Sequence, residues 1–138
     1  MTWEEKREAL HEGLRALQVT AADVAAREIE GACGEWARMA EAIRAARRTV
    51  FLVGNGASAS MASHVAADLA KNGRVRTQVF TDLSLVTAVG NDIGYEAVFS
   101  EPLGLRMDPG DMLVAISSSG RSSNILSAAR AAAGLGGG

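Results

Sequence analysis

Residues 111–124 read DMLVAISSSGRSSN, in which a short apolar segment runs directly into a loop rich in serine. Residues 49–58 read TVFLVGNGAS and follow the same plan, because an apolar and β-branched segment ends in a loop that contains glycine. We expect buried strands at Thr49–Val53 and Asp111–Ile116, each followed by a helix. Such strand–loop–helix units predict an α/β fold with a parallel sheet and crossover helices.

The helices and weaker elements of this region follow from periodicity. Ala59–Lys71 predicts a helix whose apolar face carries Met61, Val65 and Leu69. Residues 83–90 fit a strand or a helix. The remaining expectations are a strand at Arg76–Phe80, a turn at Asn91–Gly94, and helices at Tyr95–Leu103 and Asn124–Ala133.

The first 48 residues predict helices that pack or oligomerise, ahead of a domain at 49–138. Residues 2–18 fit a helix with a capping box formed by Thr2 and Glu5. A second helix is expected from Thr20 to about Arg47. Its apolar positions are Ile29, Cys33, Trp36, Ala40 and Ile43, and we expect Cys33 to be a small buried hydrophobe. We interpret Arg44, Arg47 and Arg48 as a solvated helix end, where cations oppose the helix dipole.

Length and composition limit the classes of function. The chain has 138 residues, enough for one compact core, and 14 basic against 16 acidic residues give a net charge of −2. This balance does not favour a protein that binds nucleic acid through a global positive field. The charged N-terminus and the lack of a long apolar segment predict a soluble, cytoplasmic protein without a membrane partner. A single cysteine excludes an internal disulfide.

The loop Ser117–Ser123 has the chemistry of a phosphate site. It is expected to join the end of a strand to the start of a helix, where free N–H groups and the helix dipole favour an anion. Five serine hydroxyls add rotatable donors, and no acidic residue lies within the loop. The alternative is a helix N-cap with spare serines, because serine is common at such caps.

The loop Gly54–Ser58 is the second ligand candidate, since parallel-sheet proteins bind ligands beyond the carboxyl ends of their strands. Asn55, Gly56 and Ser58 are its candidate contacts. The competing interpretation is a dinucleotide-binding module, but the glycine fingerprint is incomplete after Gly56, which weakens it.

His64 and Asp68 are four residues apart, so they lie on one face of the expected helix. Such a pair can bind a divalent metal or act as acid and base. The alternative is an ordinary interaction on a helix surface.

Taken in order, these segments resemble a known family. They are GNGAS at 54–58, HVAADL at 64–69, TAVGNDIGY at 87–95, PGD at 109–111 and ISSSGRSSN at 116–124. Over residues 49–133 the series is similar to the phosphoheptose isomerases, which act on sedoheptulose 7-phosphate and belong to the sugar isomerase (SIS) superfamily.

The resemblance implies a flavodoxin-like three-layer α/β sandwich that assembles as a homo-oligomer, a tetramer or a dimer, with active sites between subunits. It implies a sugar contact from Asp92 as well as from Asn55 and Ser58, and a zinc ion, one per site, bound by His64 and Asp68. It also implies that Asp68 acts as the base. The phosphate is expected on Ser117, Ser118, Ser119 and Ser122.

The sequence departs from the family at two points. The family has glutamate where this chain has Asp68, one methylene shorter. The family also continues with a last helix that supplies a catalytic histidine and another metal ligand, and no residue of this sequence matches them. The implied activity is isomerisation of sedoheptulose 7-phosphate to D-glycero-D-manno-heptose 7-phosphate. The alternative is a non-catalytic SIS domain that binds a sugar phosphate or a protein partner as a regulator.

Overall fold

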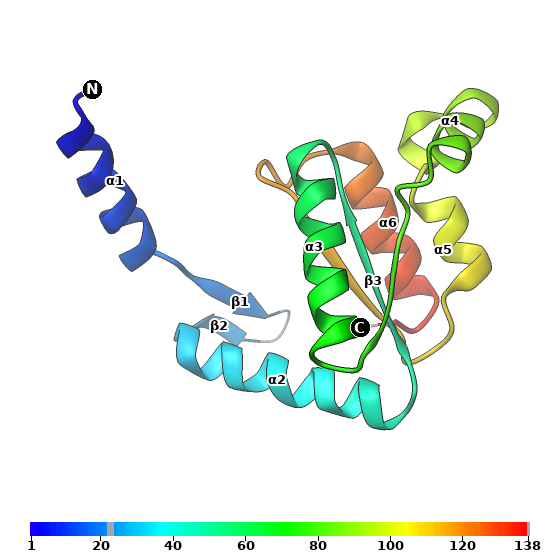
Figure 1. Cartoon of the computed structure of the whole chain (residues 1–138), viewed down its shortest axis with the longest axis horizontal. Coiled ribbons are helices and arrows are strands. Elements are labelled where there is room, and N and C mark those ends of the chain that lie inside the picture. Colours follow the sequence, from blue (N-terminus) through cyan, green and yellow to red (C-terminus); the bar gives the residue numbers. More distant parts are fainter. Residues whose placement is uncertain (22–23, 138) are drawn as a thin grey trace. The chain divides into compact units, whose positions relative to one another are not determined.

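The computed structural model describes residues 1–21 and 24–137, which form two compact units, Met1–Met39 and Ala40–Gly138. The smaller unit contains a helix, a pair of short antiparallel strands and the start of a second helix (Figure 1). These elements are α1 (Trp3–Arg15), β1 (Val19–Ala21), β2 (Val24–Arg27) and the first part of α2 (Ile29–Ala45).

The capping box predicted at the N-terminus of α1 is confirmed. The Thr2 N–H donates to Glu5 Oε2 at 2.6 Å, and the Glu5 N–H donates to Thr2 Oγ1 at 3.2 Å. Two of the N–H groups that a helix start leaves without helical partners are thereby satisfied, which fixes where α1 begins.

The prediction of a second helix from Thr20 to Arg47 is wrong at its start. Residues 22–23 of that predicted helix lie outside the described residues. Helix α2 begins at Ile29, and extended backbone precedes it. Val19 and Thr20 are β-branched, and such residues favour strands over helices. Cys33 is exposed, not buried, while its neighbour Ala32 is buried. Of the predicted apolar positions, Ile43 is buried, whereas Ile29 and Trp36 are exposed.

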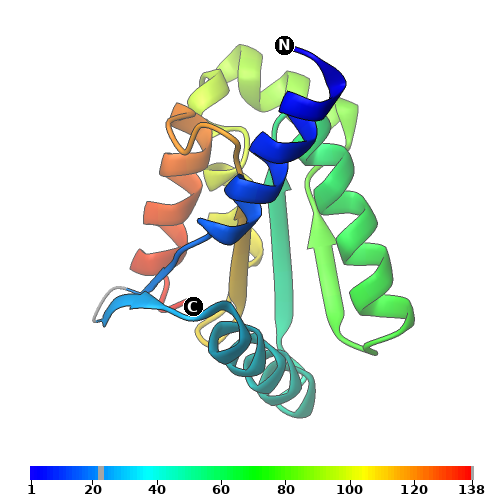
Figure 2. The same ribbon diagram turned by 90° about the vertical axis from the view of Figure 1, so that its left-hand side faces the viewer.

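The larger unit is built on a parallel sheet in the order β4–β3–β5 (Figure 2). The central strand β3 (Thr49–Gly54) pairs with β4 (Arg76–Val79) from Thr49↔Arg76 to Leu52↔Val79. It pairs on its other side with β5 (Met112–Ile116), from Val50↔Met112 to Gly54↔Ile116. The three predicted strands of this region are therefore confirmed.

Helices cover both faces of this sheet. They are α3 (Ala57–Lys71), α4 (Leu83–Asp92), the 3-10 turn η1 (Tyr95–Ala97), α5 (Ser100–Arg106) and α6 (Ser123–Gly134). Residues 83–90, which fitted a strand or a helix, are helical, and Asp82 caps them by accepting from the Leu85 N–H. The predicted turn at Asn91–Gly94 is wrong in its first half, because Asn91 and Asp92 close α4. In the described parts of the chain, no helix has the length and apolar character required to cross a bilayer.

Alternate residues of β3 face the two layers of helices, as the pleat of a strand requires. Phe51 and Val53 pack in one cluster with buried residues of α5 and α6, among them Leu103 and Ala128. Val50 and Leu52 belong to a second cluster with residues of α3 and the end of α2. The predicted three-layer α/β sandwich with a parallel sheet is confirmed.

Two details of burial differ from expectation. The face that α3 presents to the sheet carries Ala62 and Ala66, whereas Met61 and Val65 are exposed. Small alanines allow the helix to approach the strands closely, so the larger side chains turn outward. Strand β5 was expected to be buried, but its residues are half-buried or exposed, because it is an edge strand of the sheet.

A buried carboxylate joins the start of β3 to the start of β5. Asp111 Oδ1 accepts from the Thr49 N–H at 2.8 Å, and Oδ2 accepts from the Asp108 N–H at 2.9 Å. Asp111 is 5% exposed. Without this side chain two N–H groups in a protected position would lose their acceptor.

We predict that Asp111→Ala lowers the free energy of unfolding by about 2–4 kcal/mol, because two hydrogen bonds to a charged acceptor are lost. Urea denaturation followed by circular dichroism measures this change. Asp108→Ala is the matched control, since Asp108 is exposed and its carboxylate is not one of the two acceptors. A loss under about 0.5 kcal/mol for Asp111→Ala, within the range of ordinary surface substitutions, would contradict the assigned role.

Candidate functional site

The two loops singled out in the sequence lie side by side at the carboxyl edge of the sheet. Gly54, the last residue of β3, pairs with Ile116, the last residue of β5. The Gly54–Ser58 loop and the Ser117–Ser123 loop therefore leave neighbouring strands at the same level. This edge is where ligands bind in open parallel sheets.

Two glycines allow the first loop to turn sharply into α3. A Cβ at Gly54 would lie 2.6 Å from the backbone carbonyl of Ser58, so only glycine permits this approach of helix to strand. Gly56, the N-cap of α3, has a φ of 54°, a left-handed conformation that glycine adopts without strain. Asn55 and Ser58 are thus held next to each other, and the Ser58 N–H donates to the Asn55 carbonyl at 3.0 Å.

A pair of asparagines joins the two loops directly. Asn55 Nδ2 donates to Asn124 Oδ1 at 2.9 Å, and Asn124 Nδ2 donates to Asn55 Oδ1 at 2.8 Å. The Tyr95 hydroxyl adds a third segment by donating to Asn55 Oδ1 at 3.2 Å. Asn124 is 1% exposed, in the first turn of α6. The sequence analysis gave Asn124 and Tyr95 no role. Their place in two of the segments that resemble the family was the only indication that they belong to the site.

The asparagine pair leaves Asn55 one free donor. Its Oδ1 already accepts two hydrogen bonds, and one of its two amide hydrogens is used by Asn124. The second amide hydrogen of the half-buried Asn55 has no acceptor among the described residues. Its orientation is fixed by the other three bonds, so it is a preorganised donor for a ligand oxygen.

The serine loop is shaped by its own side chains. Ser117 Oγ accepts from the Gly120 N–H at 3.1 Å, and Ser119 Oγ accepts from the Arg121 N–H at 3.2 Å. Gly120 has a φ of 62°, which turns the chain back toward α6. Two amides that could bind an anion are therefore occupied, but the hydroxyl hydrogens of Ser117 and Ser119 remain available as donors.

The start of α6 completes the donor set. Ser122 is the N-cap, and its side chain makes no capping hydrogen bond. The N–H groups of Ser123 and Asn124 have no acceptor among the described residues, as expected for the first turn of a helix without a side-chain cap. Uncapped N–H groups and the positive end of a helix dipole are features that favour an anion, and they occur here in a chain whose net charge is −2.

His64 and Asp68 do not join this site within one chain. His64 Nε2 lies 3.4 Å from Asp68 Oδ2, and the two side chains are 81% and 56% exposed. Both lie on the outward face of α3. Asp68 is ten residues beyond Ser58, so it lies about 15 Å further along the helix axis, away from the carboxyl edge of the sheet.

The pair alone does not make a zinc site. A catalytic zinc ion takes three protein ligands and a structural one takes four. Among the described residues no group of three or more His, Cys, Asp or Glu side chains is placed to hold a metal. The described residues therefore supply at most two of the ligands that zinc requires.

Asp92 is the last residue of α4, three positions before Tyr95. It is exposed, and its Oδ1 accepts from Asn91 Nδ2 at 2.7 Å. Since Tyr95 contacts Asn55, Asp92 belongs to a segment that reaches the asparagine pair. No hydrogen bond joins Asp92 itself to the described residues of the two loops.

The family model described as "SIS domain" matches residues 11–137. The chain belongs to the SIS domain family. A phosphoheptose isomerase of Rhodospirillum rubrum is 38% identical over 133 residues, covering 89% of this chain and 70% of that protein. One from Aliarcobacter butzleri is 41% identical over 95 residues, covering 63% of this chain. The resemblance to phosphoheptose isomerases found in the sequence is thereby confirmed.

Solved structures agree with this family. A phosphoheptose isomerase from Neisseria gonorrhoeae matches 97% of this SIS domain chain with a TM-score of 0.77 and 30% sequence identity. A phosphoheptose isomerase from Francisella tularensis matches 99% of it with a TM-score of 0.77 and 25% identity. The chain spans 66% and 72% of these two structures, and 49% of the Aliarcobacter relative.

We predict that Asn124→Ala lowers the free energy of unfolding of this SIS domain by about 1–3 kcal/mol, because Asn55 loses one donor and one acceptor at a partly buried position. Thermal or urea denaturation measures the loss. Ser123→Ala, one position earlier and exposed, is the control and is expected to change stability by less than about 0.5 kcal/mol. Equal effects of the two substitutions would show that the asparagine pair does not stabilise the junction of the loops.

Proposed function

We propose that this chain isomerises sedoheptulose 7-phosphate to D-glycero-D-manno-heptose 7-phosphate. The observation that carries the proposal is the junction of the two loops through Asn55 and Asn124, beside an uncapped helix N-terminus. The names of the phosphoheptose isomerase relatives give the class, isomerisation of a heptose phosphate, and the particular sugar follows from the family resemblance. Cytoplasmic location stays a prediction from the sequence.

The phosphate is proposed to bind the serine loop. The hydroxyls of Ser117, Ser118, Ser119 and Ser122 and the first N–H groups of α6 supply neutral donors around one anion. Neutral donors and a helix dipole hold a phosphate without the strong attraction of several cations, so product can leave. Binding at the phosphate end then orients the distant carbons that react.

The sugar oxygens are proposed to contact Asn55 and Ser58 beside the turn at Gly56, with Asp92 from α4. The free amide hydrogen of Asn55 can donate to a hydroxyl or to the carbonyl oxygen of the open-chain sugar. A donor at that oxygen stabilises the negative charge that develops when the adjacent carbon loses its proton.

Asp68 is proposed as the base. A carboxylate removes the proton from the carbon next to the carbonyl, which gives an enediolate, and the proton is returned to the neighbouring carbon. The net change moves the carbonyl between the first two carbons and needs no oxidant or reductant. His64, whose Nε2 lies 3.4 Å from Asp68 Oδ2, is proposed to orient the carboxylate.

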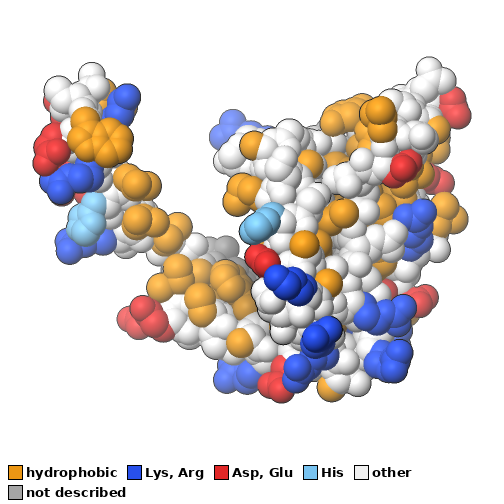
Figure 3. All heavy atoms as spheres, viewed as in Figure 1, with side chains coloured by type: hydrophobic (Ala, Val, Ile, Leu, Met, Phe, Trp, Pro, Cys, Tyr) orange, Lys and Arg blue, Asp and Glu red, His pale blue; other side chains and the backbone are white. Residues whose placement is uncertain are grey.

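The geometry favours a site completed by a second copy of the chain. Asp68 faces outward from α3 and lies about 15 Å from the start of that helix, so it is poorly placed for a sugar bound at the same chain's serine loop. We therefore propose a homo-oligomer, a tetramer or a dimer, in which α3 of one copy faces the serine loop of another. Met61 and Val65 of α3 are exposed, so contact with another copy would bury them, and Figure 3 shows hydrophobic side chains scattered among polar ones over this part of the molecule.

A zinc ion at His64 and Asp68 stays a proposal. Zinc would act as a Lewis acid on the sugar oxygens, but the described residues supply too few ligands for it. No step of the mechanism is therefore assigned to it. Zinc analysis of the purified oligomer, with His64→Ala for comparison, tests whether the pair contributes ligands.

We predict that Asp68→Asn lowers the turnover of sedoheptulose 7-phosphate at least about hundredfold, because the amide cannot accept the proton. Asp68→Glu, which has the side chain of the family, is expected to keep at least the wild-type rate. A coupled isomerase assay measures both, and calorimetric titration of the same sugar phosphate measures binding separately.

Substitution of the serine loop separates binding from chemistry. Ser118→Ala with Ser119→Ala is expected to weaken binding of the sugar phosphate about tenfold or more, since two donors are lost. If the wild-type chain binds the sugar phosphate but does not turn it over, the enzymatic proposal is contradicted and the non-catalytic regulator is favoured. If the wild-type chain does not bind the sugar phosphate, both the isomerase and a regulator that binds this ligand are contradicted.

We predict that the chain is oligomeric, because α1 buries none of its residues although Trp3, Leu10 and Leu14 are apolar. An isolated helix of this length is marginal in water unless its apolar face is covered. Light scattering after size exclusion should give a multiple of the monomer mass, and Leu10→Lys with Leu14→Lys should lower it. Glu8→Lys, also exposed on α1, is the control for the added charge, and a monomeric wild type would contradict the prediction.

A further inference from the structure

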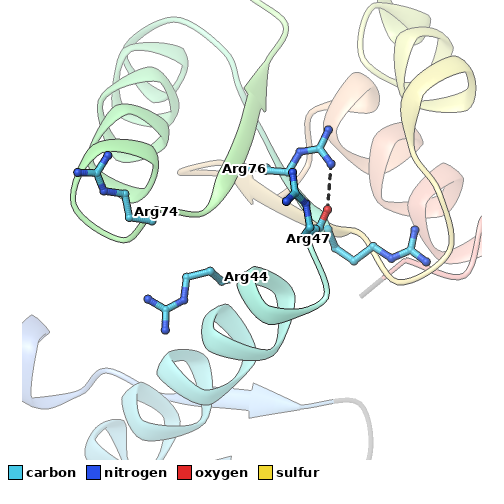
Figure 4. Close-up of a pocket in the computed structure, with 5 residues that line it drawn as sticks. Arg44, Arg47, Arg74 and Arg76 are labelled. Carbon is cyan, nitrogen blue, oxygen red and sulfur yellow. Dashed lines mark hydrogen bonds between the residues drawn. The ribbon is translucent and has the colours of Figure 1, made fainter.

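Five arginines line a hollow of about 300 Å³ at the edge of the sheet opposite the serine loop (Figure 4). They come from the last turn of α2, the link from α2 to β3, the link from α3 to β4, and the first residue of β4. They are Arg44, Arg47, Arg48, Arg74 and Arg76, and we call the site the arginine hollow. All five belong to the compact unit Ala40–Gly138.

The sheet register brings these arginines together. Thr49 pairs with Arg76, so the amino ends of β3 and β4 lie side by side, and the residues that precede each strand share one edge. The six residues of β3 separate this edge from the serine loop by about 20 Å. The arginine hollow is therefore a different place from the proposed sugar-phosphate site. The sequence interpretation of Arg44, Arg47 and Arg48 as a solvated helix end did not include Arg74 and Arg76.

The charge in the arginine hollow is poorly compensated. Within residues 40–137, Glu41 is the carboxylate that forms an ion pair with the cluster, at 3.1 Å from Arg44. The ends of α2 and α3 add roughly half a negative charge each. The five guanidinium groups contribute five positive charges, and the Glu41 carboxylate and the two helix ends together offset about two of them. The local charge is therefore about +3, in a chain whose net charge is −2.

Most of the guanidinium groups are free to bind a ligand. Arg76 Nη1 donates to the Arg47 carbonyl at 3.0 Å, which leaves its other donors open. The side chains of Arg47, Arg48 and Arg74 make no hydrogen bond or ion pair with the described residues. Each guanidinium carries five donors in a planar fork that matches the oxygens of a phosphoryl group.

The backbone gives an independent observation. Among the described residues, Arg47 and Arg74 are the two non-glycine residues with a left-handed conformation, with φ of 56° and 54°. At both positions glycine would remove the strain. Arg47 occupies the place after a helix where glycine is usual, since the Arg48 N–H donates to the Ile43 carbonyl at 2.9 Å. Helix termination alone does not account for arginine at these positions.

We propose that the arginine hollow binds a compact anion with two or more phosphoryl groups. A single phosphate carries too little charge to offset a local charge of about +3, whereas a di- or triphosphate carries enough. Its volume suits a small molecule, at the lower end of ligand pockets. An extended nucleic acid would need a positive stripe, and the net negative charge of the chain does not favour one.

The test is calorimetric titration of the whole chain with inorganic pyrophosphate and tripolyphosphate at low ionic strength. Arg47→Gly with Arg74→Gly removes two charges and relieves both left-handed residues. We expect affinity for pyrophosphate to fall at least about tenfold, while the melting temperature stays equal or rises. Arg130→Gln with Arg15→Gln removes the same charge from exposed positions outside the hollow and is expected to change affinity less than about twofold.

Two further measurements distinguish the arginine hollow from the serine loop and from a nucleic-acid site. Ser118→Ala with Ser119→Ala should leave the tighter phase of pyrophosphate binding unchanged, because the serine loop is at the opposite edge of the sheet, and should remove only weaker binding at that loop. Loss of pyrophosphate binding in that variant, equal losses in both arginine pairs, or no binding by the wild type would overturn the proposal. Binding of a single-stranded oligonucleotide in preference to tripolyphosphate would also overturn it, in favour of a nucleic-acid site.

Discussion

Five paired positions between β3 and β5, from Val50↔Met112 to Gly54↔Ile116, determine where the polar groups of this chain lie. Because the strands are parallel, both carboxyl ends reach the same edge, and the loops that follow them become neighbours. The Asn55–Asn124 pair then closes the junction with two hydrogen bonds across 69 residues of sequence. A shift of one residue in this register would exchange the two faces of β3 between its helical layers.

The same strand pairing places two different sets of hydrogen-bond donors at opposite edges of the sheet. One edge of the sheet carries hydroxyls, uncapped helix N–H groups and the single guanidinium of Arg121, a donor set for which we propose one phosphate. The other edge carries five guanidinium groups, whose summed positive charge is the basis for proposing a ligand with several negative charges. The end of each crossover helix lies at the second edge, so its dipole opposes an anion there, and the arginines must outweigh it.

Assembly is the other constraint on function. The outward faces of α1 and α3 hold apolar side chains that no described residue of their own compact units covers, and α3 also carries His64 and Asp68. A single copy keeps this pair apart from the serine loop, since both side chains point away from the sheet. The proposed chemistry therefore depends on contact between copies, in which the apolar side chains of α3 would be buried together with the polar pair.

The sequence by itself determined the α/β class, because apolar segments that end in glycine or serine loops leave few alternatives to a parallel sheet. It also determined the capping box of α1 and the two polar loops that follow β3 and β5, which depend on residues close together in the chain. The strands at residues 19–27, the alanine face of α3 and the exposure of Cys33 were decided by packing, which local patterns do not report. Asn124 beside Asn55, and Arg76 beside Arg47, are contacts between distant residues. Only the register of the strands brings them together, because no local preference of either partner specifies the distance between them.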